Sequence, residues 1–180
     1  MLINKLKNLF FKENFYRKKS KEVLGNIIQL SKSDIFFDKY KISRDFLSRF
    51  EIIIIHIFLL SKRLETKKDK KKSLQFIYNY FFEYIDFSLR EMGVGDLSVG
   101  KKVKILATKF STRMINYEKY SENNLNTIDI PIKKFIYKES RNKSIVKKFS
   151  LYIKNQNIYL EKKSLNKIFS KNCFSLRNLK

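Results

Sequence analysis

Residues 50–60 read Phe-Glu-Ile-Ile-Ile-Ile-His-Ile-Phe-Leu-Leu, which is the most apolar run in the chain. Four consecutive isoleucines would suit a buried strand, but Phe46 and Leu64 continue the apolar spacing at helical intervals on both sides. A strand of that length would be unusual. The run is about half of the ~20 residues that a helix needs to span a bilayer, and it contains Glu51 and His56. We therefore expect a buried helix that does not cross a membrane.

Two more helices are predicted on either side of a glycine-containing turn. Apolar residues recur at spacings of three and four over 74–89, and the same spacing continues over 99–117. Between these segments, Gly93 suits the left-handed end of a helix, and Asp96 or Ser98 suits the N-cap of the following one. The sequence thus predicts two long helices joined by a tight turn.

The rest of the chain fits the same fold class. The basic segments 131–137 and 144–154 are helical in pattern, and the lysine-rich stretch 67–72 is expected to be a solvated connection. No segment shows the sustained alternation of a half-buried strand. We therefore expect an all-α protein, a single helical domain of five to seven helices with a Gly-Val-Gly-Asp turn between two long helices.

The expected organisation has three parts. Residues 1–22 form a basic amphipathic N-terminal segment, 23–120 form the core, and 121–180 form a basic helical part that packs on the core or extends it. For the N-terminal segment three interpretations stay open: a helix on an anionic membrane, an organelle transit peptide, or a helix docked on its own domain. All three rest on one helical face that carries Leu2, Leu6, Leu9 and Phe10.

The net charge of +23 comes mainly from lysine, since 32 of the 40 basic residues are Lys. Lys, Ile, Asn, Phe and Tyr have A/T-rich codons, so compositional drift of the genome accounts for part of this charge. Drift does not explain why residues 131–180 hold 14 basic and 2 acidic residues, a net charge of +12. RNA or anionic lipid would therefore meet the C-terminal part. The basic-surface candidates are Lys147, Lys148, Lys162 and Lys163.

The residues needed for catalysis or metal binding are scarce. Residues 95–101 fit the phosphate-loop spacing G-x-x-x-x-G-K, but Lys102 stands where Ser or Thr holds Mg²⁺, and a helix rather than a strand precedes it. His56 is the only histidine, and on an isoleucine-rich helix it is more typical of a satisfied core residue than of a general base. Cys173 is the only cysteine. We expect no enzyme activity, no metal site and no cofactor.

Charged residues gather around the glycine turn. Arg90, Glu91 and Asp96 lie close together in sequence, and Lys101 follows. Two interpretations stay open from the residues alone: Arg90 and Asp96 pair to clamp the turn, or the turn presents a polar surface to another protein. If Arg90 were buried, losing Asp96 would cost on the order of 3–5 kcal/mol of stability.

A resemblance to a known family rests on this region. The run Asp-Phe-Ser-Leu-Arg-Glu-Met-Gly-Val-Gly-Asp-Leu-Ser-Val-Gly-Lys-Lys-Val-Lys over 86–104 resembles the hallmark block of the ubiquinol–cytochrome c chaperone family, in its bacterial form. Residues 49–64 resemble the helix that precedes this block, and 23–28 resemble an N-terminal block weakly. The chain departs from the family pattern at Leu24, where an aromatic residue is usual, and at Thr112, where Gly is usual.

The resemblance implies an all-helical, non-enzymatic assembly chaperone that binds newly made cytochrome b and supports assembly of respiratory complex III, with residues 23–120 as its chaperone core. It implies a cytoplasmic protein, peripheral at the inner membrane, or a protein of the mitochondrial matrix if the source is eukaryotic. The alternative is an RNA- or ribosome-binding accessory module that uses the basic C-terminal segment. The partner-binding or turn-forming candidates are Arg90, Glu91, Gly93, Gly95, Asp96, Lys101 and Arg113.

Overall fold

The computed structural model describes residues 2–65, 71–138, 142–169 and 173–174. Within these residues the chain forms helices and no strands, which confirms the all-α prediction. Seven of the helices have five residues or more, within the predicted range. The helices are α1 (Leu2–Ser31), α2 (Asp34–Asp38), α3 (Phe46–Glu65), α4 (Lys71–Glu91), α5 (Asp96–Lys119), α6 (Glu122–Leu125), α7 (Asp129–Phe135), α8 (Lys143–Lys162) and α9 (Leu165–Ile168).

The centre of the fold is α3, the helix predicted from the isoleucine run. Every residue from 50 to 60 is buried, because α3 packs against α1, α4, α5 and α8. A helix that is covered on all sides has no polar face, which is why the run lacks the periodicity of a surface helix. Among the described residues, no helix has both the length and the apolarity that crossing a bilayer requires.

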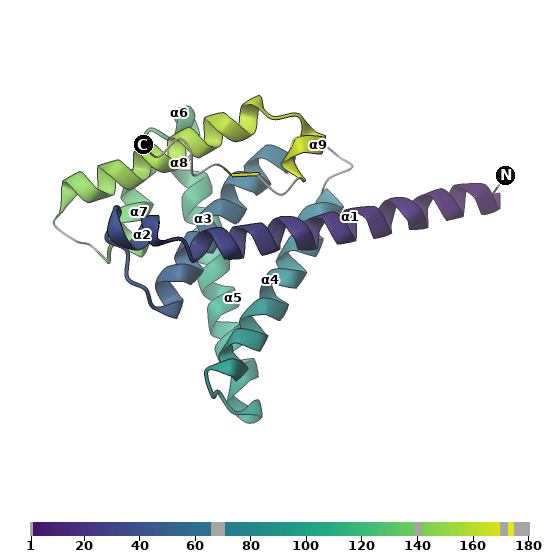
Figure 1. The fold of residues 1–180 in the computed structure, drawn as a ribbon, viewed down its shortest axis with the longest axis horizontal. Coiled ribbons are helices and arrows are strands. Elements are labelled where there is room, and N and C mark those ends of the chain that lie inside the picture. The colour runs from purple at the N-terminus through teal and green to yellow at the C-terminus, as the bar shows by residue number, and fades with distance from the viewer. Residues whose placement is uncertain (1, 66–70, 139–141, 170–172, 175–180) are drawn as a thin grey trace.

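The long helix α1 crosses the body and packs mainly on α4 (Figure 1). The guanidinium of Arg17 lies 5.2 Å from the ring centroid of Phe76, and the ammonium of Lys21 lies 5.7 Å from that of Tyr80. These contacts join the basic side of α1 to the aromatic face of α4. The helix is continuous through residues 22 and 23. The side chains of residues 2–12 lie outside the described part, so the apolar face expected there stays a prediction.

The helices α4 and α5 form an antiparallel hairpin whose turn points away from the rest of the molecule (Figure 1). Aromatic rings join the two helices: the Phe110 ring centroid lies 5.5 Å from those of both Phe81 and Phe82. The connection expected before this hairpin falls largely on residues 66–70, outside the described residues.

The C-terminal part shares the same hydrophobic core. Side chains of α7 and α8, including Ile132, Phe149 and Ile153, are fully buried together with those of α3. Cys173 is also buried, at 1% exposure. In Figure 1, α8 lies at the end of the molecule opposite to the tip of the α4–α5 hairpin.

Candidate functional site at the tip of the hairpin

The turn at the hairpin tip is built on two glycines. Gly93 has a φ of +82°, which an L side chain rarely adopts. Its N–H donates to the carbonyl of Arg90 (2.9 Å), and the N–H of Val94 donates to the carbonyl of Leu89 (3.0 Å). This pair of bonds is the Schellman motif, which satisfies the last carbonyls of α4. The N-cap of α5 is Gly95, with no side-chain capping bond, so the expectation of Asp96 or Ser98 at this position is wrong.

Asp96 has a different role, as a partner of Arg90. The Arg90 Nε donates to Asp86 Oδ2 at 2.6 Å, and its Nη1 donates to Asp96 Oδ1. The hydrogen bond to Asp86, together with that to Asp96, raises the pKa of Arg90. One arginine thus ties the last turn of α4 to the first residue of α5. The two interpretations left open by the sequence are therefore compatible, since this clamp lies on the surface.

The clamp is exposed to solvent, which corrects the stability effect considered for a buried arginine. The side chain of Arg90 is 45% exposed and that of Asp96 is 87% exposed. Ion pairs in this setting contribute little stability because water and salt screen them. The pairs restrict the direction of the side chains at the tip more than they hold the fold together.

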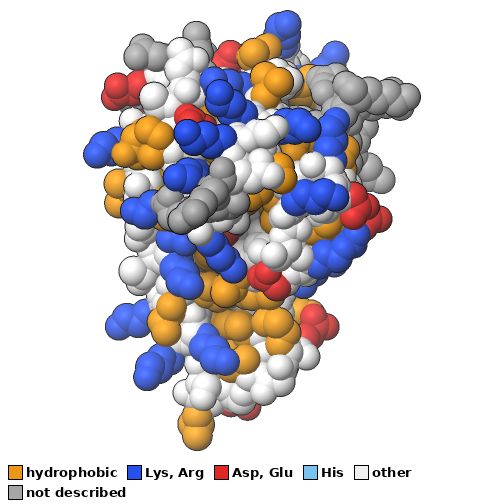
Figure 2. Space-filling model, turned by 90° about the vertical axis from the view of Figure 1, so that its left-hand side faces the viewer, with side chains coloured by type: hydrophobic (Ala, Val, Ile, Leu, Met, Phe, Trp, Pro, Cys, Tyr) orange, Lys and Arg blue, Asp and Glu red, His pale blue; other side chains and the backbone are white. Residues whose placement is uncertain are grey.

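Large apolar side chains surround the clamp. Phe87 is 59% exposed, Met92 is 52% exposed, and Leu97 is fully exposed. Ile105 and Ile115 continue along α5, so the hairpin holds five of the ten large hydrophobic residues that are exposed among the described residues. Figure 2 shows hydrophobic side chains gathered over the lower end of the molecule, where the hairpin lies, with basic side chains around them. Exposed apolar side chains that gather on one part of a surface are typical of interaction sites.

The other predicted residues of the tip also lie in this region. Glu91 is exposed at the end of α4, and Lys101 is exposed on the second turn of α5. The structure therefore brings together Arg90, Glu91, Gly93, Gly95, Asp96 and Lys101. Asp86 was not singled out from the sequence as a partner of Arg90, although a spacing of four on a helix allows such a pair.

Arg113 lies in the body of the molecule, away from the tip. Its Nε donates to both carboxylate oxygens of Glu51 (3.0 and 3.1 Å), and its Nη2 donates to Oε1 of Glu51 (2.8 Å). The guanidinium lies 4.1 Å from the ring centroid of Phe135. The side chains are only 16% and 9% exposed for Arg113 and Glu51. Burial raises the pKa of Glu51 even though Arg113 opposes this effect. Arg113 thus joins α5 to α3 and α7.

His56 is a satisfied core histidine, as its position on the isoleucine run predicted. Its Nδ1 lies 2.7 Å from the carbonyl oxygen of Ile52, and its Nε2 lies 2.7 Å from the hydroxyl of Tyr152. Because a carbonyl only accepts, Nδ1 carries the proton and Nε2 accepts from the Tyr152 hydroxyl. Burial lowers the pKa of His56 to about 4. Among the described residues, no group of three His, Cys, Asp or Glu side chains could hold a metal ion.

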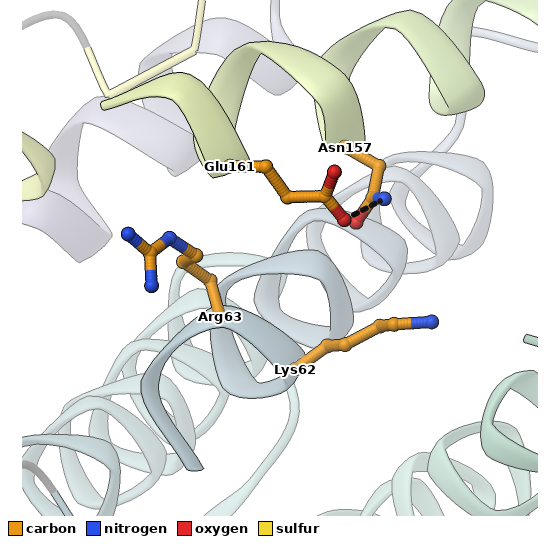
Figure 3. A pocket seen from close by; sticks show the side chains of 4 residues that line it. All are labelled: Lys62, Arg63, Asn157 and Glu161. Atoms are coloured by element: carbon orange, nitrogen blue, oxygen red, sulfur yellow. Dashed lines mark hydrogen bonds between the residues drawn. The ribbon is translucent and has the colours of Figure 1, made fainter. Parts of the chain in front are cut away.

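A pocket of about 340 Å³ lies between the C-terminal ends of α3 and α8 (Figure 3). Its lining side chains are Lys62, Arg63, Asn157 and Glu161. Arg63 donates to the carbonyls of Leu160 (3.2 Å) and Lys163 (3.1 Å), and Lys62 donates to the carbonyl of Ser121 (3.0 Å). The two cations therefore cap and connect helix ends.

The basic-surface candidates lie at the two ends of α8. Lys147 and Lys148 are exposed near its N-terminal end, and Lys162 is exposed at its last residue. Lys163 follows as the C-cap, with its ammonium 4.4 Å from the ring centroid of Tyr159. The two pairs are separated by roughly 20 Å along the helix axis. They form a strip and not a compact cluster.

Comparisons with known proteins agree with the resemblance noted in the sequence. Residues 38–173 match the sequence model of a family described as ubiquinol-cytochrome C chaperone. The crystal structure of the Cbp3 homolog from Brucella abortus has the same fold, with a TM-score of 0.75 and 20% identity over 96% of this chain and 94% of that chain. No curated protein sequence matches the chain. The matched range includes the hairpin tip, Arg113 and α8.

Proposed function

The chain belongs to the ubiquinol-cytochrome C chaperone family, and from this membership we propose that it is a non-enzymatic assembly chaperone for respiratory complex III. Its client is newly made cytochrome b, which it holds until later subunits join. The family match over residues 38–173 is the observation that carries the proposal. The protein then works on the cytoplasmic side of the inner membrane, or in the mitochondrial matrix of a eukaryote.

We assign client binding to the hairpin tip. A chaperone of a membrane protein must cover apolar segments that water would otherwise contact. Phe87, Met92 and Leu97 supply uncovered apolar surface at the end of a projecting hairpin. These side chains are available without any rearrangement of the core, since none of them is packed inside it.

The charges at the tip fit a role in orienting the bound client. Arg90 is held by two carboxylates, so the tip presents fixed charges beside the apolar side chains. Glu91 and Lys101 are exposed nearby. Polar groups at the rim of an apolar contact contribute to specificity and register more than to affinity. In this arrangement the apolar residues bind and the clamp keeps the tip in one shape.

Deletion of the gene tests the proposal as a whole. We expect native gels of membranes from the deletion strain to lose assembled complex III while ATP synthase stays intact. ATP synthase serves as the control for general damage to the membrane. Complex III at normal abundance in the deletion strain would overturn the proposal.

A pair of matched variants tests the assignment of the tip. Leu97→Asp removes a fully exposed apolar group at the tip, and Ile130→Asp makes the same change at a residue of α7 that is 46% exposed. We expect both purified variants to melt like the wild type, because neither residue is buried. Complex III should fall in the Leu97→Asp strain and stay normal in the Ile130→Asp strain. A normal abundance of complex III in both strains would show that the tip does not bind the client.

The RNA- or ribosome-binding alternative depends on the lysines of the C-terminal part. Binding through phosphates would weaken steeply with salt, with a log–log slope of about 0.7 to 0.9 for each neutralised charge. Changing Lys147, Lys148, Lys162 and Lys163 to Ala should then release the protein from ribosomes. The family match over residues 38–173 supports the chaperone function over this alternative.

A further inference from the structure

The outer face of α8 carries two large apolar side chains that stay about half exposed to solvent. Leu151 is 57% exposed and Ile158 is 48% exposed. They are seven residues apart, which places them on the same face of the helix, two turns and roughly 10 Å from each other. The opposite face of α8 is buried against α3 and α7.

Lysines flank this apolar pair along the helix. Lys147 and Lys148 are exposed one turn before Leu151, and Lys162 is exposed one turn after Ile158. The helix contains five lysines and a single acidic residue, Glu161. The carboxylate of Glu161 accepts a hydrogen bond from Asn157 at 2.8 Å. The outer face of α8 is therefore an apolar centre with a positively charged border.

This pattern favours a lipid surface over a nucleic acid as the partner. An interfacial helix buries its apolar residues at the level of the lipid headgroups, while lysines beside them extend to the lipid phosphates. Binding to RNA would use aromatic rings for base stacking and arginine for its fork of donors. The helix has no arginine, and the ring of Tyr159 is contacted by the ammonium of Lys163. Two exposed aliphatic side chains fit the lipid interface.

The helix is held rigidly in place from its inner side. Tyr152 bonds His56 in the core, and Arg63 donates to carbonyls at the C-terminal end of α8. At the other end the side chain of Asn142 accepts from the N–H of Ile145 at 3.2 Å as an N-cap. The outer face is thus formed before any partner arrives, so no ordering of the helix opposes binding.

We propose that the outer face of α8 docks the protein on the surface of an anionic lipid bilayer. Leu151 and Ile158 enter the headgroup region, and the lysines contact lipid phosphates. The surface lies at the end of the molecule opposite to the hairpin tip (Figure 1), so it is separate from the client surface proposed above. Lipid binding and complex III assembly can therefore be tested independently.

A single tryptophan offers a direct test, because the chain contains none. Leu151→Trp places a reporter at the centre of the proposed surface, and Leu97→Trp places one at the hairpin tip. Each purified full-length protein is mixed with vesicles of phosphatidylcholine that contain about one third phosphatidylglycerol, and with vesicles of phosphatidylcholine alone. We expect the emission of the Leu151→Trp variant to shift to shorter wavelength on the anionic vesicles only. No shift in this variant, or an equal shift in the Leu97→Trp variant, would overturn the proposal.

Substitutions then separate the apolar and charged contributions. Leu151→Ser with Ile158→Ser should reduce co-sedimentation with the anionic vesicles at least tenfold, since the charges alone bind weakly. Lys147→Ala with Lys148→Ala should weaken binding about 25-fold, with a smaller dependence on salt. All of these residues are exposed, so circular dichroism should show unchanged melting.

Controls of the same chemistry come from α5. Leu97→Ser with Ile105→Ser also removes two exposed aliphatic residues from one helix, and this variant should sediment with the vesicles like the wild type. If single-stranded RNA binds the wild type and the Leu151→Ser, Ile158→Ser variant equally, and anionic vesicles bind neither, the surface is an RNA site and the proposal is wrong.

Discussion

Two arginines of the α4–α5 hairpin are held by carboxylates, and their surroundings are opposite. Arg90, at the tip, bonds Asp86 and Asp96 in solvent, whereas Arg113, in the body, bonds Glu51 with both side chains nearly enclosed. The same charge-assisted bond has different consequences in the two places. Near water it shapes a surface and adds little stability, and inside the fold its loss leaves a charge without a partner.

The body and the tip of the molecule therefore have different roles: the body holds the fold together, and the tip is proposed to bind the client. The buried core is centred on α3, where Glu51 and His56 bond partners on α5 and α8. Recognition is assigned to the tip, where polar and apolar groups are exposed. We expect substitutions in the body to change unfolding and substitutions at the tip to change assembly of complex III.

The largest effect is expected from Arg113→Leu. Glu51 is then left buried without its partner, which should lower the free energy of unfolding by about 3–5 kcal/mol at pH 7. The loss should be smaller at pH 5, because a buried, unpaired Glu51 has a raised pKa and takes up a proton in the folded state. Urea unfolding at both pH values, with the wild type alongside, measures the difference.

Two variants sharpen this test. Glu51→Leu with Arg113→Leu should recover much of the lost stability, because no charge is then buried alone. Arg90→Leu should melt like the wild type, since its ion pairs are exposed. Equal destabilisation by Arg90→Leu and Arg113→Leu would contradict the claim that only the buried ion pair matters for stability.

The next effect is a pH dependence that originates in His56. The unfolded state binds a proton near pH 6.5, whereas burial holds the pKa of the folded state at about 4. The unfolded state therefore binds more protons between these values, so stability rises with pH through this window and is lost on acidification. The expected loss between pH 7 and pH 5 is about 2 kcal/mol.

Measuring urea midpoints against pH for the wild type and for His56→Gln isolates this contribution. Glutamine keeps a polar group opposite Tyr152 but does not ionise, so its slope between pH 7 and pH 5 should be flatter. Glu51 remains in both proteins, and its raised pKa acts in the opposite sense. Identical slopes in the two proteins would show that His56 is not the origin of the dependence.

A smaller effect is expected at the turn itself. Gly93→Ala should cost about 1 kcal/mol, because alanine is strained at a φ of +82° although no atom lies within 4 Å of the added Cβ. Gly100→Ala is the matched control on α5, also with nothing within 4 Å, and it should stabilise the helix by up to about 1 kcal/mol. Thermal melting measures both variants. A change of the same sign in both would contradict the assigned role of Gly93.

The smallest effect on stability is expected for Asp96→Ala. Removing one of the two partners of Arg90 should leave the melting temperature unchanged, because the pair is exposed. Complex III should nevertheless decrease in cells, since the tip loses its fixed shape. An abundance of complex III equal to that of the wild type in this strain would show that the Arg90–Asp96 pair is not needed for assembly.

How far these features could be predicted from the sequence depends on the range of the interactions. Helical periodicity predicted α3, α4 and α5 because it reflects local geometry. The pairs Glu51–Arg113 and His56–Tyr152 join residues 62 and 96 positions apart, and no pattern in one chain connects them. Arg113 was grouped with the residues of the tip only through the family resemblance. In the structure it lies in the body of the molecule, where it bonds Glu51 on α3.

The N-cap of α5 shows a second limit. Asp96 has the residue type that favours an N-cap, but its carboxylate is engaged by Arg90 and the cap falls on Gly95. A charged partner from the previous helix outweighed the local preference, and such competition cannot be judged from residue types alone. The exposure of Leu97 could not be predicted from the sequence either, because helical spacing does not tell which face of a helix another helix covers.

The most direct test of the account is photo-crosslinking in the native cell. A benzophenone amino acid replaces Leu97 at the tip in one strain and the exposed Lys32, which follows α1, in another. The account predicts an adduct between position 97 and cytochrome b, with none from position 32. An adduct with cytochrome b from position 32 and none from position 97 would contradict it.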